Sequence, residues 1–325
     1  MGFGDFESLC AKAALPLCSL IGPPSNIAGQ TGIPTQCYSR SVGLANTIIF
    51  QGAADFAHII ALIMTTIMII HVRSKFTAVG MGSSTLTLSN SKYSLGPTGR
   101  KEITTFFYIY MALTTISLIV DAGVITPGSS AYLYFVAVQS GLASALCVCL
   151  LINGFVGFQL YEDGTTLSVW LLRIVSAALF IVSFAISLLT FKGWAGLGPT
   201  HTIGLFTVLY IFNGIFLLVF VVMQIMLVVN TLQDRWPLFD IGFGVFFFII
   251  GQVILYVFSA LICENASHYL DGLFFATVCN LLAVMMVYKV CFVNVDSGMR
   301  YADVFLVLGL HHEGRPRIQC WHEGQ

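Results

Sequence analysis

The sequence predicts an all-α fold: a polytopic membrane protein built as a seven-transmembrane-helix bundle. Hydrophobic residues make up 57% of the 325-residue chain and charged residues only 9%, whereas a soluble domain carries about 25% charged residues. So few charges cannot coat a soluble surface of this size, and we expect membrane lipid to cover much of it. Because backbone polar groups must be paired inside lipid, apolar spans of this kind form helices.

Each predicted span comes from an apolar stretch of about 20 residues, the length needed to cross a bilayer as a helix. The third and fifth stretches are longer and should tilt or protrude. Together they form a transmembrane domain over residues 47–289. The seven predicted spans are Thr47–Ile70, Ile103–Val120, Leu133–Phe158, Val169–Phe191, Ile203–Val229, Phe239–Ile262 and Tyr269–Tyr288.

Residues 1–46 precede the first span and carry Asp5, Glu7, Lys12 and Arg40. Their apolar runs are too short and interrupted for the core of a signal peptide, so we expect the first span to act as the insertion signal. Of the 14 Lys and Arg residues, only Lys12, Arg40 and Lys192 fall on the N-terminal side of the predicted bundle. Positive charge favours the cytosolic side, so the N-terminus is predicted lumenal and the C-terminus cytosolic.

Four cysteines fall on the predicted lumenal side: Cys10, Cys18, Cys37 and Cys263. That compartment is oxidising, which favours disulfides over four unrelated thiols. Four cysteines allow three pairings, and the sequence does not choose among them. Asn265 begins the only glycosylation sequon, also on the lumenal side, but so close to the helix ends that access for the transferase is doubtful.

A polar stripe is predicted on the first helix, where Gln51, Asp55 and His58 stand at i, i+4 and i+7 and so share one face. An intramembrane carboxylate is a candidate for a proton or ion pathway. The structural interpretation is hydrogen bonding between helices, with Asp55 paired to His58 or protonated. We favour the structural interpretation. Asp121 and Asp271 lie near predicted helix ends, where we expect water.

Catalytic signals are weak. The chain has no GxSxG, HExxH or Walker-type motif, so we expect no catalytic, cofactor-binding or metal site, and no cofactor. Glu162 and Asp163 form an acidic turn between the third and fourth spans, a candidate cytosolic contact for a partner. The net charge of −1 gives no indication of a nucleic-acid partner.

Several segments resemble one family. The pattern begins with Phe6-Glu7-Ser8-Leu9-Cys10 and Cys37-Tyr38-Ser39-Arg40-Ser41, continues through Val120-Asp121-Ala122-Gly123 and Tyr161-Glu162-Asp163-Gly164, and includes Gly251-Gln252-Val253 and His268-Tyr269-Leu270-Asp271-Gly272. Their number and order over residues 1–289 resemble the fungal chitin synthase export chaperones, membrane proteins of the endoplasmic reticulum. The resemblance implies a chaperone, not an enzyme, that helps chitin synthase fold and leave that compartment, supporting cell-wall chitin synthesis.

Other protein classes remain as alternatives. A seven-helix receptor matches the helix count, and a transporter or channel could use Asp55 and His58. A catalytic subunit of chitin synthesis fits poorly, because transfer from a nucleotide sugar normally requires a sizeable cytosolic domain. Neither a ligand pocket nor a repeat of the kind found in transporters is visible in the sequence.

Two segments depart from the family pattern. Residues 81–99, rich in Ser, Thr and Leu, interrupt the first cytosolic loop, and their flanks can be encoded by splice-site-like codons. Residues 290–325 follow a similar donor-like codon pattern, and shifting their reading frame by one base gives a tail like that of the family. We interpret residues 81–99 as a retained intron and residues 290–325 as intron translation followed by a frameshift; a genuine divergent tail is the alternative.

Overall fold

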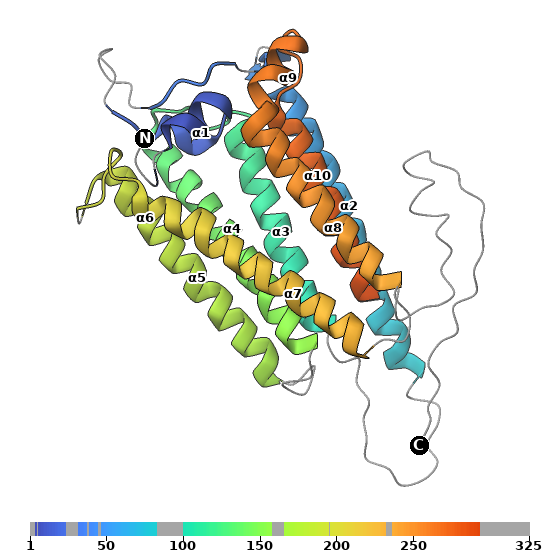
Figure 1. Ribbon diagram of the computed structural model, residues 1–325. Coiled ribbons are helices and arrows are strands. Elements are labelled where there is room, and N and C mark those ends of the chain that lie inside the picture. Colours follow the sequence, from blue (N-terminus) through green and yellow to red (C-terminus); the bar gives the residue numbers. More distant parts are fainter. Residues whose placement is uncertain are drawn as a thin grey trace, which may run out of the picture.

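The computed structural model describes residues 4, 6–23, 32–37, 39–44, 47–82, 100–157, 166–194, 196–231 and 236–292. Within these ranges the architecture is a helix bundle with a small cap at one end (Figure 1). The long helices are α2 (Gly52–Gly82), α3 (Arg100–Asp121), α4 (Ser130–Gly157), α5 (Thr166–Lys192), α7 (Asn213–Thr231), α8 (Trp236–Val253) and α10 (Gly272–Phe292).

Seven helical stretches in the described chain are long and apolar enough to cross a membrane, which agrees with the seven predicted spans. Two of them are composite. The short α6 (Ile203–Phe206) continues through a π-helical segment, η2 (Thr207–Phe212), into α7, and α8 continues through a second, η3 (Ile254–Phe258), into α9 (Ser259–Asn265). A π segment shifts the hydrogen-bond register within a continuous helix, so neither span is broken.

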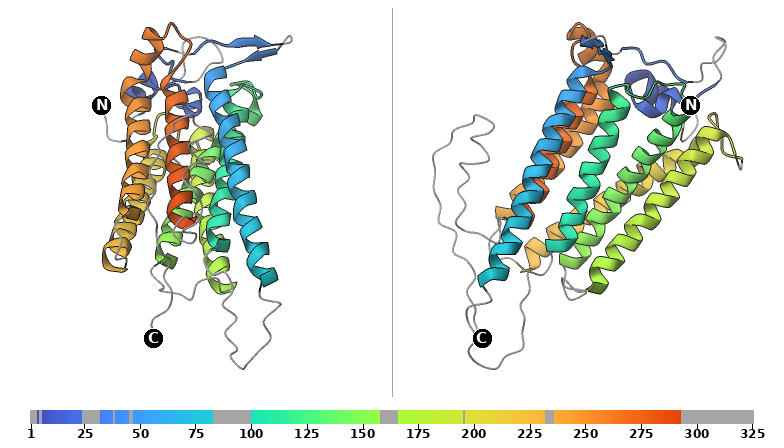
Figure 2. Two further views of the ribbon diagram at one scale, coloured as in Figure 1. Left: turned by 90° about the vertical axis from the view of Figure 1, so that its right-hand side faces the viewer. Right: turned by 180° about the vertical axis from the view of Figure 1, so that it is seen from behind.

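The start of the first span differs from the prediction. Residues Thr47–Ile49 form a strand, β2, antiparallel to β1 (Val42–Leu44), with Val42 opposite Ile49 and Leu44 opposite Thr47. The β-branched Thr47, Ile48 and Ile49 favour an extended backbone, and α2 begins only at Gly52. Figure 2 shows the hairpin at the same end of the bundle as α1.

The N-terminal cap consists of residues 6–23 and 32–37, including α1 (Glu7–Lys12) and the 3₁₀ helix η1 (Pro16–Ser19). Its apolar side chains pack onto the ends of three helix pairs. Phe6 and Ile21 contact Leu205, near α5 and η2; Ala13 packs with Leu255 and Ala276, between η3 and α10; and Leu17 packs with Val120 and Val136, between α3 and α4. The cap therefore contacts helices from different parts of the bundle and links them.

The bundle has two groups of helices, which meet where α2 packs against α3 and where α7 packs against α8. Helix α4 packs against α3, α5 and α7, whereas α10 packs against α2 and α8, and α2 contacts α3. Successive spans alternate in direction, so that α2, α4 and α6 begin at the cap end and α3, α5 and α8 begin at the opposite end (Figures 1 and 2).

Basic residues divide between the two ends of the bundle. At the cap end, Lys192 donates a hydrogen bond to the Tyr134 hydroxyl at 2.7 Å and lies over the ring of Trp194. At the opposite end, Lys289 pairs with Asp240 at 2.6 Å. Aromatic and basic groups of this kind are typical of membrane interfaces. Which end faces the lumen stays a prediction from the charge bias.

Candidate functional site

Two disulfides fix the cap. Cys10 is bonded to Cys18, with Cα atoms 5.6 Å apart, and Cys37 is bonded to Cys263, with Cα atoms 6.1 Å apart. The first closes a local loop around α1, and its sulfurs are buried among apolar side chains. The second links positions 226 residues apart and joins the cap to the end of α9. Of the three pairings left open by the sequence, the structure contains this one.

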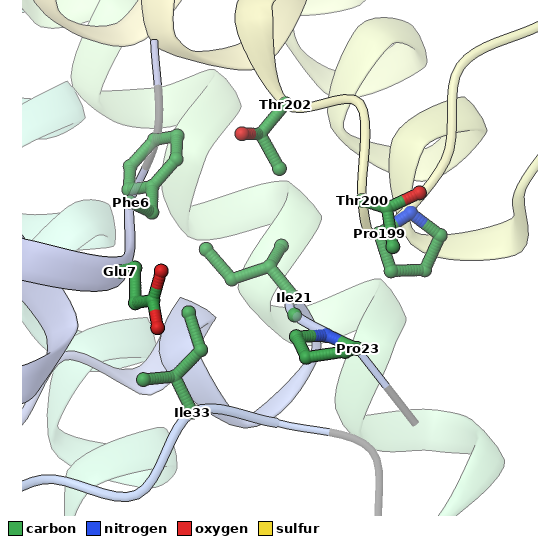
Figure 3. Close-up of a pocket in the computed structure, with 9 residues that line it drawn as sticks. Phe6, Glu7, Ile21, Pro23, Ile33, Pro199, Thr200 and Thr202 are labelled. Carbon is green, nitrogen blue, oxygen red and sulfur yellow. The ribbon is translucent and has the colours of Figure 1, made fainter. Parts of the chain in front are cut away.

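A shallow cavity lies where the cap meets the loop between α5 and α6 (Figure 3). Its volume is about 140 Å³, and Phe6, Ile21, Ile33 and Pro199 supply most of its apolar wall. Binding sites for small molecules usually occupy about 300–1,000 Å³. This cavity is therefore too small for a ligand site of that kind.

A buried polar cluster lies just below the cap, between α2 and α3. His58 Nε2 and Asp121 Oδ2 are 3.1 Å apart, and both side chains are almost fully buried. Asp55 is 5% exposed, and neither of its carboxyl oxygens has a hydrogen-bond partner. Its carboxyl group interacts electrostatically with Asp121, His58 and Asp271. Of the two states expected for Asp55, paired to His58 or protonated, the pairing is not formed, because Asp121 occupies that position.

The predicted three-residue stripe also needs correction. Gln51 lies one residue before α2, with its backbone in the left-handed region at φ 49°, so only Asp55 and His58 share a helical face. The carbonyl of Gln51 accepts a hydrogen bond from the backbone N–H of Asp55 at 3.2 Å. The polar face is completed from α3 by Asp121, which comes from another helix and therefore could not be found from spacing.

Asp271 marks the start of α10. Its Oδ1 accepts a hydrogen bond from the backbone N–H of Phe274 at 3.1 Å, and its Oδ2 accepts one from Ser39 Oγ at 3.2 Å. The first contact caps the helix, and the second holds the chain after the cap against α10. Burial raises the pKa of Asp271, and Asp121 adds to that effect. The expectation that Asp121 and Asp271 lie near water is wrong, since they are 6% and 1% exposed.

The seven spans differ in how much of each is buried inside the protein. Only 11% of the span through α7 and 17% of the span through α8 are buried inside the protein, compared with 44% for those through α2 and α4. Both helices present continuous apolar stripes. The α7 stripe contains Ile215, Leu218, Val222, Met226 and Val229, and the α8–α9 stripe contains Phe239, Phe243, Phe246, Ile249, Val253, Val257 and Leu261.

The remaining predicted positions are Asn265 and the acidic turn at Glu162 and Asp163. Glu162 and Asp163 lie outside the described residues. Asn265 ends α9 and is exposed, and its side-chain amide donates to the carbonyl of Leu261 at 2.9 Å. Sequence reasoning missed His268, whose Nδ1 lies 3.0 Å from Cys37 Sγ. Its signal was the presence of a histidine five residues after Cys263, a cysteine predicted to be lumenal.

Comparison with known proteins identifies the family. The family model described as "Chitin synthase export chaperone" matches residues 2–93 and 81–294, and so covers most of the chain. The chain belongs to the chitin synthase export chaperone family. This family is a chaperone family and not an enzyme family, which agrees with the prediction made from the missing catalytic motifs.

Individual chitin synthase export chaperones are similar over nearly the same length. The relative from Aspergillus clavatus is 67% identical over 290 residues, which are 89% of this chain and 82% of the relative. The relative from Aspergillus fumigatus is 66% identical over 289 residues, with the same coverage. The relative from Coccidioides immitis is also 66% identical over 289 residues, 89% of this chain and 81% of the relative. No solved structure matches the chain.

Proposed function

We propose that this chain is an export chaperone of the endoplasmic reticulum membrane, and that its client is chitin synthase. The observation that carries the proposal is the 67% identity to a chitin synthase export chaperone over 89% of the chain. The multi-pass helical fold suits the task. A chaperone in the bilayer can shield the polar or poorly packed helices of a polytopic client with its own helix faces until the client has folded.

The apolar stripes of α7 and α8 are the proposed contact surface. Their spans are the least buried of the seven, and the stripes are continuous along the helices. Lipid-exposed faces can pack against a client helix without displacing any element of the chaperone itself. The turn at Glu162 and Asp163 is proposed as an additional cytosolic contact, because it joins α4 and α5 on the predicted cytosolic side.

A second candidate function, proton- or ion-coupled transport, is favoured by one observation: the buried Asp55 carboxyl group has no hydrogen-bond partner. Changing Asp55 to Asn separates the two functions. Under the chaperone proposal the variant keeps export activity or loses protein abundance, because Asp55 only contributes to packing. A transporter would keep its abundance and location and lose activity.

The experiment for the main proposal is deletion of the gene, followed by imaging of tagged chitin synthase. We expect the synthase to stay in the endoplasmic reticulum and cell-wall chitin to fall, and the intact chain to restore both on re-expression. Normal synthase traffic in a strain that lacks this chain and any second copy would contradict the proposal. The purified chain alone should neither bind a nucleotide sugar nor make polymer.

Residues 81–99 are proposed to be a retained intron, and residues 290–325 to be intron translation followed by a frameshift. Residues 83–99 and 293–325 lie outside the described residues. The family match is divided into two segments that overlap at residues 81–93, and it ends at residue 294. The proposal is supported by the division of the match within the first segment and by its end five residues into the second. Sequencing of spliced transcripts tests it, and messages that run continuously through both segments in most reads would contradict it.

A further inference from the structure

The two disulfides differ in their surroundings. Cys18 Sγ, in the Cys10–Cys18 bond, lies within an apolar cluster, 4.0 Å from the backbone carbonyl of Ala13. The Cys37–Cys263 bond instead has an imidazole beside it. His268 Nδ1 lies 3.0 Å from Cys37 Sγ and 3.7 Å from Cys263 Sγ.

We propose that the Cys37–Cys263 bond is a site of reversible thiol–disulfide exchange with a dithiol. In this exchange His268 accepts the proton of the attacking thiol and donates a proton to the leaving sulfur. The thiolate is the species that attacks a disulfide, and histidine is the side chain that exchanges protons near neutral pH. Because the imidazole lies beside both sulfurs, it can donate a proton when the disulfide is reduced and accept one when the disulfide re-forms. This inference does not depend on the identity of the client.

The backbone holds His268 in this place. Its N–H donates to the carbonyl of Cys263 at 2.9 Å, and its carbonyl accepts from the N–H of Arg40 at 2.7 Å. Ser267 and His268 both have positive φ, at 52° and 66°. Residues other than glycine seldom adopt this conformation, and such backbone strain is concentrated at functional sites. The backbone of His268 is thus held by both of the segments that the disulfide joins.

The exchange proceeds through Cys37. Cys37 is 6% exposed and Cys263 only 1%, so an incoming thiolate reaches Cys37 Sγ first. The first thiol of the dithiol gives its proton to His268 and attacks as a thiolate. A new S–S bond forms between the dithiol and Cys37, the Cys37–Cys263 bond breaks, and the electron pair leaves with Cys263, which takes the proton back from His268. The second thiol then loses its proton to His268 and attacks the mixed disulfide, and Cys37 leaves with the electron pair and takes that second proton.

Two electrons and two protons pass from the dithiol, which becomes a cyclic disulfide, to the two cysteines. Oxidation by a disulfide reagent is the reverse, with Cys37 attacking first and Cys263 resolving the mixed disulfide. The opened form should stay docked, because two contacts that do not involve the sulfurs hold the same segment: Ser39 donates to Asp271, and the Arg40 guanidinium lies 5.3 Å from the Tyr269 ring. These contacts keep the thiols together, so that the bond can re-form.

The test uses the full-length protein in native membranes, treated with dithiothreitol under non-denaturing conditions and then quenched with acid and a thiol-blocking reagent. Peptide mass spectrometry follows each disulfide over time. We expect Cys37–Cys263 to open at least about tenfold faster than Cys10–Cys18, and to close again in oxidised glutathione. Equal opening rates, or opening only after denaturation, would overturn the proposal.

Three variants test the roles of individual residues. His268→Asn keeps a side chain that tolerates positive φ and should slow exchange at Cys37–Cys263 about tenfold. Ser267→Gly is the control and should leave the rate unchanged. Cys263→Ser should trap glutathione on Cys37. An unchanged rate in His268→Asn, or no trapped adduct in a folded Cys263→Ser protein, would contradict the mechanism.

A metal site is the competing outcome. The sulfurs of Cys37 and Cys263 and the ring nitrogen of His268 all lie within 4.8 Å of one another, and two thiolates with one imidazole are typical zinc ligands. The reduced protein is therefore incubated with Zn²⁺ before oxidised glutathione is added. Bound zinc that prevents the disulfide from re-forming would overturn the exchange proposal, whereas re-formation of the bond at the same rate supports it.

Discussion

The contact between α8 and α10 gives the sharpest stability prediction. A Cβ atom added at Gly251 would lie 2.8 Å from Cys279 Cβ and 3.6 Å from the Cα of Ala276. Carbon atoms do not approach to 2.8 Å without a shift of one helix. Gly242, on the same helix, has nothing within 4 Å of such an atom. The two glycines are thus a matched pair that differs in the space beside them.

The expected magnitude follows from two opposing terms. Replacing glycine with alanine inside a helix favours the helix by about 0.5–1 kcal/mol, and this gain applies at both positions. Overpacking costs about 1–3 kcal/mol, and it applies only at Gly251. Gly242→Ala should therefore be neutral or slightly stabilising, whereas Gly251→Ala should be less stable than Gly242→Ala by about 1–3 kcal/mol.

The assay heats the detergent-solubilised variants and measures the fraction that remains monodisperse on size exclusion. A difference of this size should lower the midpoint by several degrees, since about 1 kcal/mol corresponds to about 2–4 °C in a protein of 150–250 residues. Changing Cys279 to Gly in the Gly251→Ala background removes the clashing Cβ and should recover part of the loss. Equal midpoints for the two single variants, or no recovery in the double variant, would refute the reasoning.

Three further predictions concern the polar cluster, α10 and the topology. His58→Ala leaves the buried Asp121 carboxyl group without its partner and should destabilise the protein by about 1–3 kcal/mol in the same assay; an unchanged midpoint would contradict the pairing. Burial holds the pKa of Asp271 above its usual 3.8, so the folded protein keeps that proton to higher pH than the unfolded chain does. The free energy of unfolding should therefore fall as pH rises from about 4 through the raised pKa. Asp271→Asn, which retains a capping oxygen, should flatten this dependence. The same pH profile in the variant and the unchanged protein would contradict this role of Asp271. A reporter fused after Tyr288 should be cytosolic and one placed before Leu44 lumenal; reversed signals would refute the orientation.

Much of the fold could be predicted from the sequence because lipid imposes a simple requirement. A helix must hide its backbone across about 30 Å of hydrocarbon, so the apolar stretches alone locate all seven spans. Their ends were less certain for a physical reason. Thr47–Ile49 is as apolar as the span that follows it, but its β-branched residues pair with Val42–Leu44 instead of extending α2.

The candidate site depends on contacts between distant segments, which spacing along one helix does not encode. Asp55 and His58 were visible as a pair on one face, but Asp121 comes from another helix and is 63 residues from His58. The same limit applies to the cysteines. Their shared side followed from the predicted topology, whereas the pairing of Cys37 with Cys263 required the position of the cap on the bundle.

The π segments had no sequence signal. Thr207–Phe212 and Ile254–Phe258 are as apolar as their neighbours, and they meet beneath the cap, where the hydroxyls of Tyr210 and Tyr256 are 3.1 Å apart. Packing of Phe6 against Tyr210, with ring centroids 5.8 Å apart, places the cap directly over them. Here tertiary contacts, and not local propensity, set the helix register.

Site-specific photo-crosslinking to newly made chitin synthase tests the central claim most directly. A photoreactive residue at Phe246, 54% exposed on the α8 stripe, should crosslink to the synthase inside the endoplasmic reticulum and lose that contact after export. The matched control is Ile63 on α2, which is also 54% exposed but belongs to one of the most buried spans. We predict a synthase adduct from Phe246 and little from Ile63. Equal adducts from both positions would contradict the proposed surface, and no adduct from any position along α7 and α8 would contradict direct binding of the client by these helices.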